Sequence, residues 1–135
     1  MTIDPKKYLE IVYQVTSAPS TDTNALKERI DQLVEEGSAD VPRLITAAFG
    51  LTAEAGEFTE IVKKILLQGK PYSEENIFHM KRELGDIFWY MAQAAMALDT
   101  TFDELMDMNY QKLSARFPEG AFDVYYSENR KEGDV

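Results

Sequence analysis

The hydrophobic pattern of the chain is that of helices throughout. Apolar residues recur at spacings of three and four, and no segment alternates cleanly between apolar and polar residues. This periodicity predicts an all-α protein built as an antiparallel helix bundle. We expect five helices, over about residues 5–16, 24–36, 42–68, 74–98 and 102–117.

Residues that favour helix ends mark these boundaries. Asp4 followed by Pro5 is typical of an N-cap with proline in the first turn. Ser73 precedes two glutamates, and Thr101 with Glu104 has the pattern of a capping box. Glycine or proline stands at the expected ends of three helices, at Gly37, Gly69 and Pro118.

The chain divides into three segments of different character. Residues 1–40 form an N-terminal helical extension, residues 41–118 carry the three long helices, and residues 119–135 are a polar tail with some aromatic residues. We expect the tail to be an arm or a partly disordered segment. The first residues have no apolar stretch after their charges, and no apolar run is long enough to span a bilayer. A cytoplasmic location is therefore the default expectation.

The helix over residues 74–98 has a regular apolar stripe, which we expect to face the core. Its members are Ile77, Met80, Leu84, Ile87, Met91, Ala94 and Leu98. From Ile87 to Leu98 the helix is apolar nearly all round, so it has to be covered on every side. A chain of this size has few elements for that purpose, so we expect a second subunit to cover part of it. The alternative is the central helix of a monomer.

The composition limits the classes of function. With 135 residues, 44% of them hydrophobic and 28% charged, the chain fits one globular domain. Acidic residues outnumber basic ones by 24 to 14, and the net charge of −10 argues against binding along a nucleic-acid backbone. A small phosphorylated substrate is still possible, because divalent cations can reverse the sign of an acidic pocket. The absence of cysteine excludes thiol catalysis and zinc–thiolate sites.

Two acidic pairs stand out, Glu54-x-x-Glu57 and Glu83-x-x-Asp86. Spacing alone proves little, because about four such i,i+3 pairs are expected by chance in so acidic a chain. The placement is more informative. The first pair lies in a helical row of otherwise small or apolar residues, and each member of the second pair directly precedes a core position. Carboxylates at the edge of a core are costly unless they are paired or bind metal.

The two pairs can meet if their helices pack antiparallel across the turn near Gly69. Each pair lies about 11–15 residues from that turn, which at 1.5 Å per residue gives them similar heights. Converging carboxylates need a counter-charge, and ligands that are all oxygen favour Mg²⁺ or Mn²⁺. A di-iron site usually needs Glu-x-x-His motifs, and the one histidine, His79, does not follow a glutamate at that spacing. We expect His79 at the surface or behind a ligand.

The last long helix places Asn109, Lys112 and Arg116 on one face. An amide and two cations in a row could bind phosphate oxygens. The alternative is an exposed face with basic residues near a helix C-terminus, which the helix dipole favours. Phe88, Trp89 and Tyr90 could stack on a base, although aromatic residues at helical spacing are more often core.

Together these motifs resemble those of the MazG-like all-α NTP pyrophosphatases. The ordered set is Glu54-x-x-Glu57, 25 intervening residues, Glu83-x-x-Asp86, and then Asn109-x-x-Lys112-x-x-x-Arg116. The residues around these motifs also resemble the family's sequences, over Gly50–Glu57, Glu83–Asp86 and Lys112–Pro118. The resemblance covers roughly Leu44 to Pro118 and excludes the segment before residue 40.

This resemblance implies a catalytic role for residues 41–118. It implies that Glu54, Glu57, Glu83 and Asp86 hold Mg²⁺, and that Lys112 and Arg116, with Asn109, bind the triphosphate. The implied reaction is hydrolysis of an NTP or dNTP at the α–β bond, in a homodimer or homotetramer with sites near subunit interfaces. Ala53 precedes Glu54, so an extra acid that some related enzymes use there is missing, and no separate base is assigned.

Three hypotheses stay open at this point. The first is a nucleotide-pool house-cleaning pyrophosphatase. The second is a narrower relative, a dUTP- or dCTP-preferring enzyme or a phosphoribosyl-ATP pyrophosphohydrolase. The third is a non-catalytic acidic helical dimer that binds a partner through its apolar surface.

Overall fold

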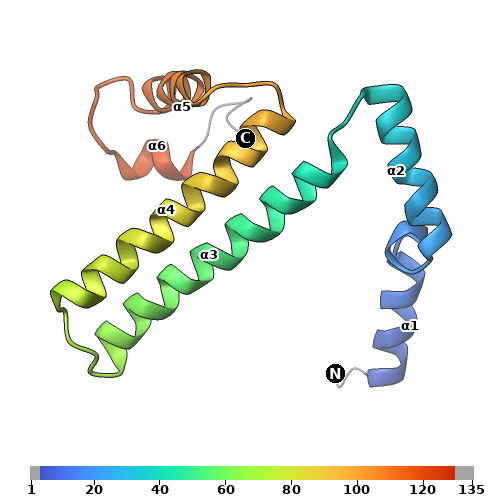
Figure 1. Ribbon diagram of the computed structural model, residues 1–135, viewed down its shortest axis with the longest axis horizontal. Coiled ribbons are helices and arrows are strands. Elements are labelled where there is room, and N and C mark those ends of the chain that lie inside the picture. The colour runs from blue at the N-terminus through green and yellow to red at the C-terminus, as the bar shows by residue number, and fades with distance from the viewer. Residues whose placement is uncertain (1–3, 130–135) are drawn as a thin grey trace. The chain divides into compact units, whose positions relative to one another are not determined.

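The computed structural model describes residues 4–129, and these contain helices and no strand (Figure 1). The all-α prediction is therefore confirmed. The chain divides after Pro42 into two compact units, each described here by itself. The first unit holds α1 (Pro5–Val15), the 3₁₀ turn η1 (Ala18–Ser20) and α2 (Thr23–Gly37). The second holds α3 (Val41–Leu67), α4 (Glu74–Ala97), α5 (Phe102–Arg116) and the short α6 (Val124–Glu128).

The expected caps start the helices where the sequence predicts. The Asp4 carboxylate accepts the Lys6 amide at 3.0 Å, and the Ser73 hydroxyl accepts the Asn76 amide at 3.3 Å. The capping box of α5 is complete. Thr101 Oγ1 accepts the Glu104 amide at 3.2 Å, and the Glu104 carboxylate accepts the Thr101 amide at 3.1 Å. Local hydrogen-bonding chemistry therefore fixes these helix starts.

The helix α2 ends at Gly37, as the sequence predicts, and the tail contains a short helix that the sequence did not predict. Gly37 belongs to α2, and the left-handed residue is Ser38, with φ of 53°. The helix in the tail is α6, which the Asp123 carboxylate caps by accepting the Tyr125 amide at 2.7 Å. At five residues, α6 is too short for apolar periodicity to predict it. The rest of the tail, residues 130–135, lies outside the described residues.

The helices α3 and α4 run side by side as an antiparallel hairpin (Figure 1). Near its open end, Arg43 Nη1 donates a hydrogen bond of 2.6 Å to Gln93 Oε1. At Gly50 the Tyr90 ring packs against the α3 backbone, and an added Cβ would lie only 2.0 Å from that ring. Glycine is required there because any side chain would occupy the space of that ring.

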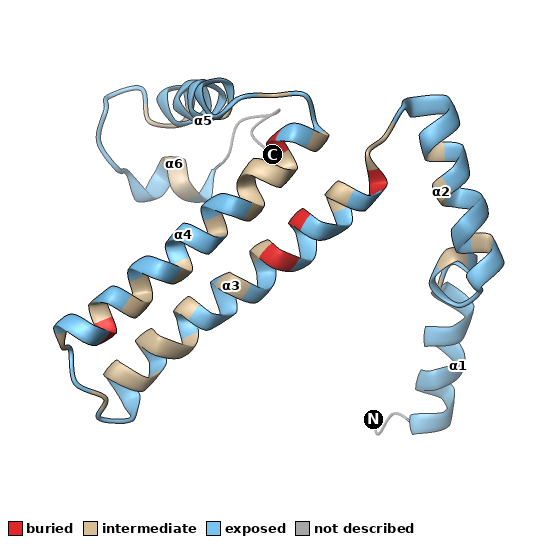
Figure 2. Ribbon diagram, viewed as in Figure 1, coloured by how far each residue is buried: buried red, intermediate tan, exposed pale blue. Residues whose placement is uncertain are grey.

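The buried core of the described chain is small. Its hydrophobic members are Val41, Ala47 and Ala95, and Ala47 is only 2% exposed. The stripe expected in the core of α4 is only partly covered, and Leu84 and Leu98 are 44% and 62% exposed (Figure 2). Met96 is 67% exposed as well. The single chain covers one face of α4 with α3, so the apolar segment 87–98 keeps uncovered side chains.

No residue of α1 or α2 is buried (Figure 2). Both helices have capped N-termini, because Asp22 caps α2 by accepting the Ala25 amide at 2.8 Å, as Asp4 caps α1. The apolar side chains of α1 are nevertheless exposed, and Tyr13 is 79% exposed. Among the described residues, no helix combines the length and the hydrophobicity that crossing a membrane requires.

Candidate metal centre

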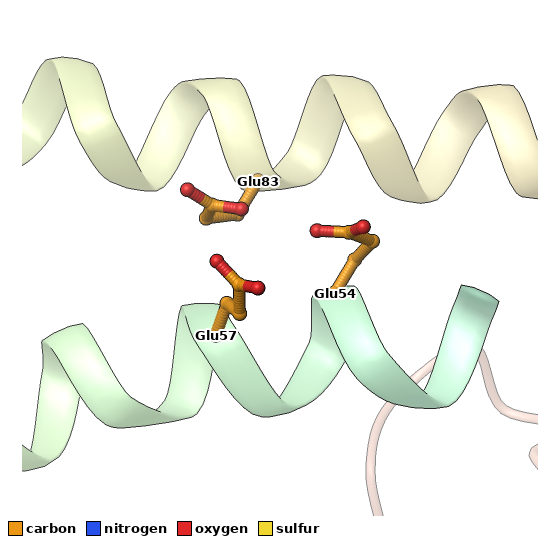
Figure 3. Close-up of side chains that lie close together, drawn as sticks. All are labelled: Glu54, Glu57 and Glu83. Carbon is orange, nitrogen blue, oxygen red and sulfur yellow. The ribbon is translucent and has the colours of Figure 1, made fainter. Parts of the chain in front are cut away.

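Three glutamates converge between α3 and α4. Glu54 and Glu57 project from α3 toward Glu83 on α4 (Figure 3). One carboxylate oxygen from each residue lies within 4.8 Å of the other two. Glu54 and Glu83 are partly buried and Glu57 is exposed. The site is therefore open to solvent on one side and bounded by helices on the other.

The helical hairpin explains this convergence. Glu54 and Glu57 are one turn apart on α3, so both carboxylates leave the same face. The turn after Leu67 includes Gly69, whose φ of +72° suits the left-handed conformation that closes a helix. The chain then returns at a height that places Glu83 opposite the pair. The antiparallel packing predicted from the distances to the turn is confirmed.

Asp86 lies outside the group of three. It is exposed, and together with Glu54, Trp89 and Tyr90 it lines an open hollow of about 440 Å³ next to the group. The structure thus gathers three of the four expected carboxylates at one point and places Asp86 beside Glu54. Its role as a metal ligand stays a prediction.

The electrostatics of the site are those of crowded negative charge. Partial burial raises the pKa of Glu54 above its usual value, and the charges of Glu57, Asp86 and Glu83 raise it further. A hydrogen bond between the side chains of Glu54 and Glu83 acts in the same direction. A bound cation would relieve this repulsion, because each carboxylate is then stabilised in its charged form.

The donor set fits a hard divalent cation. With Mg–O distances of about 2.1 Å in an octahedron, adjacent oxygen ligands are separated by about 3.0 Å and opposite ones by about 4.2 Å. The three glutamate oxygens lie within 4.8 Å of one another, so rotations of these flexible side chains would have to bring them closer together around one ion. The group contains no sulfur or nitrogen ligand, which disfavours zinc.

A second hollow of about 470 Å³ lies on the other side of the three glutamates. Its lining includes Glu57, Glu83, Lys64 and His79. His79 Nε2 is 3.9 Å from the Glu75 carboxylate, one turn earlier on α4. Lys64 is 3.1 Å from Glu60, which also pairs with Lys63. These residues lie beside the three glutamates and are not members of that group.

The predicted phosphate-binding residues all belong to α5. Asn109 and Lys112 are exposed and Arg116 is partly buried, with the three-four spacing that gives them a common face. The first turn of α5 is tied to α4 by the rings of Phe102 and Phe88, whose centroids are 6.2 Å apart. The phosphate-binding role of these residues stays a prediction.

The sequence did not predict the contact between Gly50 of α3 and the Tyr90 ring of α4. A signal for it exists, because a glycine in the middle of a long amphipathic helix costs stability unless close packing needs it. For Trp89, the sequence favoured a position in the core over stacking on a base. It is instead 54% exposed, with its ring edge-on to Tyr90 at 4.8 Å.

Comparison with known proteins identifies relatives of this chain. The model of the MazG nucleotide pyrophosphohydrolase domain matches residues 44–121, which include every predicted site residue. A protein of Mycobacterium phage L5 named "Gene 37 protein" is 35% identical over 94 residues, which cover 67% of this chain and 82% of the phage protein. No solved structure matches the chain.

Proposed function

The chain belongs to the MazG nucleotide pyrophosphohydrolase domain family, and on this basis we propose that it hydrolyses a nucleoside triphosphate with Mg²⁺. The reaction adds water across the α–β phosphate bond of an NTP or dNTP and gives a nucleoside monophosphate and pyrophosphate. The observation that carries the proposal is the meeting of Glu54, Glu57 and Glu83 inside the matched domain.

The chain's own residues have separate tasks in this proposal. Glu54, Glu57 and Glu83 hold the cation, and Asp86 completes the set from the rim beside Glu54. When bound, Mg²⁺ or Mn²⁺ would neutralise phosphate charge and activate the attacking water. No separate general base is assigned, because Ala53 offers no carboxylate beside Glu54.

The triphosphate needs cationic partners besides the metal. Lys112 and Arg116 are proposed to bind its oxygens, and Asn109 to donate a hydrogen bond through its amide. Their location near the C-terminus of α5 is also what the helix dipole favours, so their position alone does not prove this role. Phosphate binding predicts that removing either charge weakens the binding of inorganic tripolyphosphate.

A homodimer or homotetramer is part of the proposal. The support is the apolar surface that the second unit leaves uncovered on α4, including Phe88, Met96 and Leu98. Large exposed apolar patches are typical of interaction surfaces, and these side chains are 58%, 67% and 62% exposed. A second copy would cover this surface near the carboxylates, and a cytoplasmic house-cleaning role for the assembly stays a prediction.

The principal test is a panel of NTPs and dNTPs scored for pyrophosphate release with Mg²⁺ and with chelator. The proposal predicts release from at least one nucleotide, dependent on the metal, and no release of orthophosphate. A narrow response to dUTP, dCTP or phosphoribosyl-ATP would support the narrower enzymes. Failure on every substrate by folded protein would contradict the proposal.

The non-catalytic alternative makes a different prediction. An acidic helical dimer that only binds a partner should keep that binding after Glu57→Ala and gain no thermal stability from Mg²⁺. The enzyme should lose both pyrophosphate release and the rise in melting temperature that Mg²⁺ causes.

A further inference from the structure

The indole of Trp89 is exposed beside the metal centre. Trp89 lies on α4, one turn after Asp86, and 54% of its surface is accessible in the described chain. It lines the hollow of about 440 Å³ with Glu54, Asp86 and Tyr90. One side of this hollow is thus formed by proposed metal ligands and the other by aromatic rings.

Trp89 and Tyr90 form the aromatic side of this hollow, and contacts with neighbouring groups hold their rings in place. Tyr90 packs over Gly50 of α3, where even a Cβ would approach its ring to 2.0 Å. The Trp89 ring contacts Tyr90 edge-on, with centroids 4.8 Å apart and an angle of 88° between the ring planes. This arrangement braces one edge of the indole, and more than half of the residue's surface stays open to solvent. A braced, exposed ring is a suitable surface for stacking.

The two hollows beside the glutamates differ in chemistry. The hollow at Trp89 is lined by two acids and two aromatic residues and contains no Lys or Arg. It suits a flat uncharged group and disfavours free phosphate. The other hollow contains Lys64 and His79 among its polar residues and has no Trp, Tyr or Phe. Of these two hollows, the one at Trp89 therefore offers an aromatic group the stacking surface.

From this arrangement we infer that Trp89 is the stacking surface for the nucleobase of the substrate. The inference rests on the proposed function and adds the direction of the bound nucleotide, with its base beside Trp89 and its α and β phosphates at the glutamates. Every nucleobase has a flat aromatic face, so stacking on Trp89 does not by itself select purines or pyrimidines. Trp89 acts here on binding of the substrate and takes no part in bond cleavage.

The first test uses intrinsic fluorescence, because Trp89 is the single tryptophan of the chain. The probe is a dNTP analogue with a non-hydrolysable α–β imido bridge, added with Mg²⁺ to the full-length protein. Stacking predicts a change in Trp89 emission that saturates with the analogue. Inorganic tripolyphosphate, which lacks a base, should displace the analogue and restore the emission of the free protein.

The second test compares variants at matched positions on α4. Trp89→Leu should raise the KM for dNTPs about 5- to 150-fold, the range expected for loss of one base–aromatic stack. Trp89→Phe should retain most of the affinity, because it keeps an aromatic face. Phe78→Leu removes a ring that is 60% exposed elsewhere on α4 and should leave KM unchanged. Affinity for tripolyphosphate should stay the same in all three variants.

The outcomes separate this inference from the proposed function. If wild-type protein releases pyrophosphate but Trp89→Leu and Trp89→Phe both keep its KM, the stacking site is wrong and the proposed function stands. If acrylamide cannot quench Trp89 in the free protein, a second copy covers the ring and the inference is overturned. If wild-type protein hydrolyses no nucleotide, the proposed function fails and the base site fails with it. Circular dichroism shows whether Trp89→Leu is folded. If it is not, the fluorescence titration of the wild-type protein decides the question, because an analogue that leaves Trp89 emission unchanged while tripolyphosphate competes with it overturns the inference.

Discussion

The helices of the α3–α4 hairpin and of the α1–α2 unit start with the same kind of cap, but the two regions differ in how far their residues are buried. In both, side-chain oxygens cap helix starts, at Asp4 and Asp22 in one unit and at Ser73 in the other. In the hairpin, Ala47 and Gly50 allow the backbones to approach, and buried contacts follow. In the α1–α2 unit no helical residue is buried.

This difference shows what a functional site needs beyond helix formation. Glu35 and Glu36 on α2 are neighbouring carboxylates too, but among the described residues the converging group contains only Glu54, Glu57 and Glu83. The hairpin brings a carboxylate from the return helix to within 4.8 Å of the α3 pair. Convergence across two elements, and not acidity, separates the proposed site from a solvated surface.

The largest expected effect is on activity at the converging carboxylates. Glu57→Gln should reduce pyrophosphate release at least about 100-fold, since even partners behind a metal ligand can be worth that much. The matched control Glu36→Gln, which makes the same chemical change on α2, should keep wild-type activity. Initial rates over a range of Mg²⁺ concentrations measure both variants. Equal rates for the two variants would remove the distinction between the two regions.

The next effect tests the close approach of the two hairpin helices. Gly50→Ala forces the Tyr90 ring to move and should lower the free energy of unfolding by about 1–2 kcal/mol, as overpacking usually does. Gly85→Ala, with nothing within 4 Å of the new Cβ, should raise it by about 0.5–1 kcal/mol through helix propensity. Urea denaturation measures both changes. A stabilised Gly50→Ala would mean that the helices do not need their close contact.

Much of this fold can be predicted from the sequence because its controls are local. Asp4, Ser73 and Thr101 mark helix starts, because their side chains accept hydrogen bonds from amides two or three residues away. The height of the carboxylate pairs follows from counting residues to the turn. These predictions need only the helical rise and the cap chemistry.

The remaining features depend on three-dimensional packing. Whether Asp86 joins the group of three depends on a rotation of α4 that residue counting cannot resolve. The exposure of Trp89 and Leu98 depends on how few elements one chain has to cover α4. Periodicity predicts a face that should be buried, but it does not state which neighbour buries it.

A pH-dependent effect tests whether the capping box of α5, outside the hairpin, contributes to the stability of the second unit. The Thr100 hydroxyl and then the Thr101 amide lower the pKa of Glu104. A lowered pKa in the folded state adds stability above the unfolded pKa, and this is lost as pH falls through the folded pKa. The melting temperature of wild type should therefore exceed that of Glu104→Gln near neutral pH, and the gap should shrink in acid. A gap that does not depend on pH would contradict the assigned cause.

The smallest effect is expected on α1. Tyr13→Ala removes a ring that is 79% exposed and should change the free energy of unfolding by about 0.5 kcal/mol or less. Chemical denaturation of the full-length protein measures it. A loss of more than about 2 kcal/mol would show that the ring is packed in the folded protein, as buried aromatic residues are. The contrast between the two regions would then be wrong.

The most direct test of the central claim is Mn²⁺ binding followed by electron paramagnetic resonance, because the signal of the free ion is lost when it binds. We predict that wild-type protein binds Mn²⁺, that Mg²⁺ displaces it, and that Glu83→Gln weakens binding at least about 10-fold, as loss of a ligand should. Glu36→Gln should bind as wild type does. Equal Mn²⁺ affinity in wild type, Glu83→Gln and Glu36→Gln would contradict a metal centre between α3 and α4.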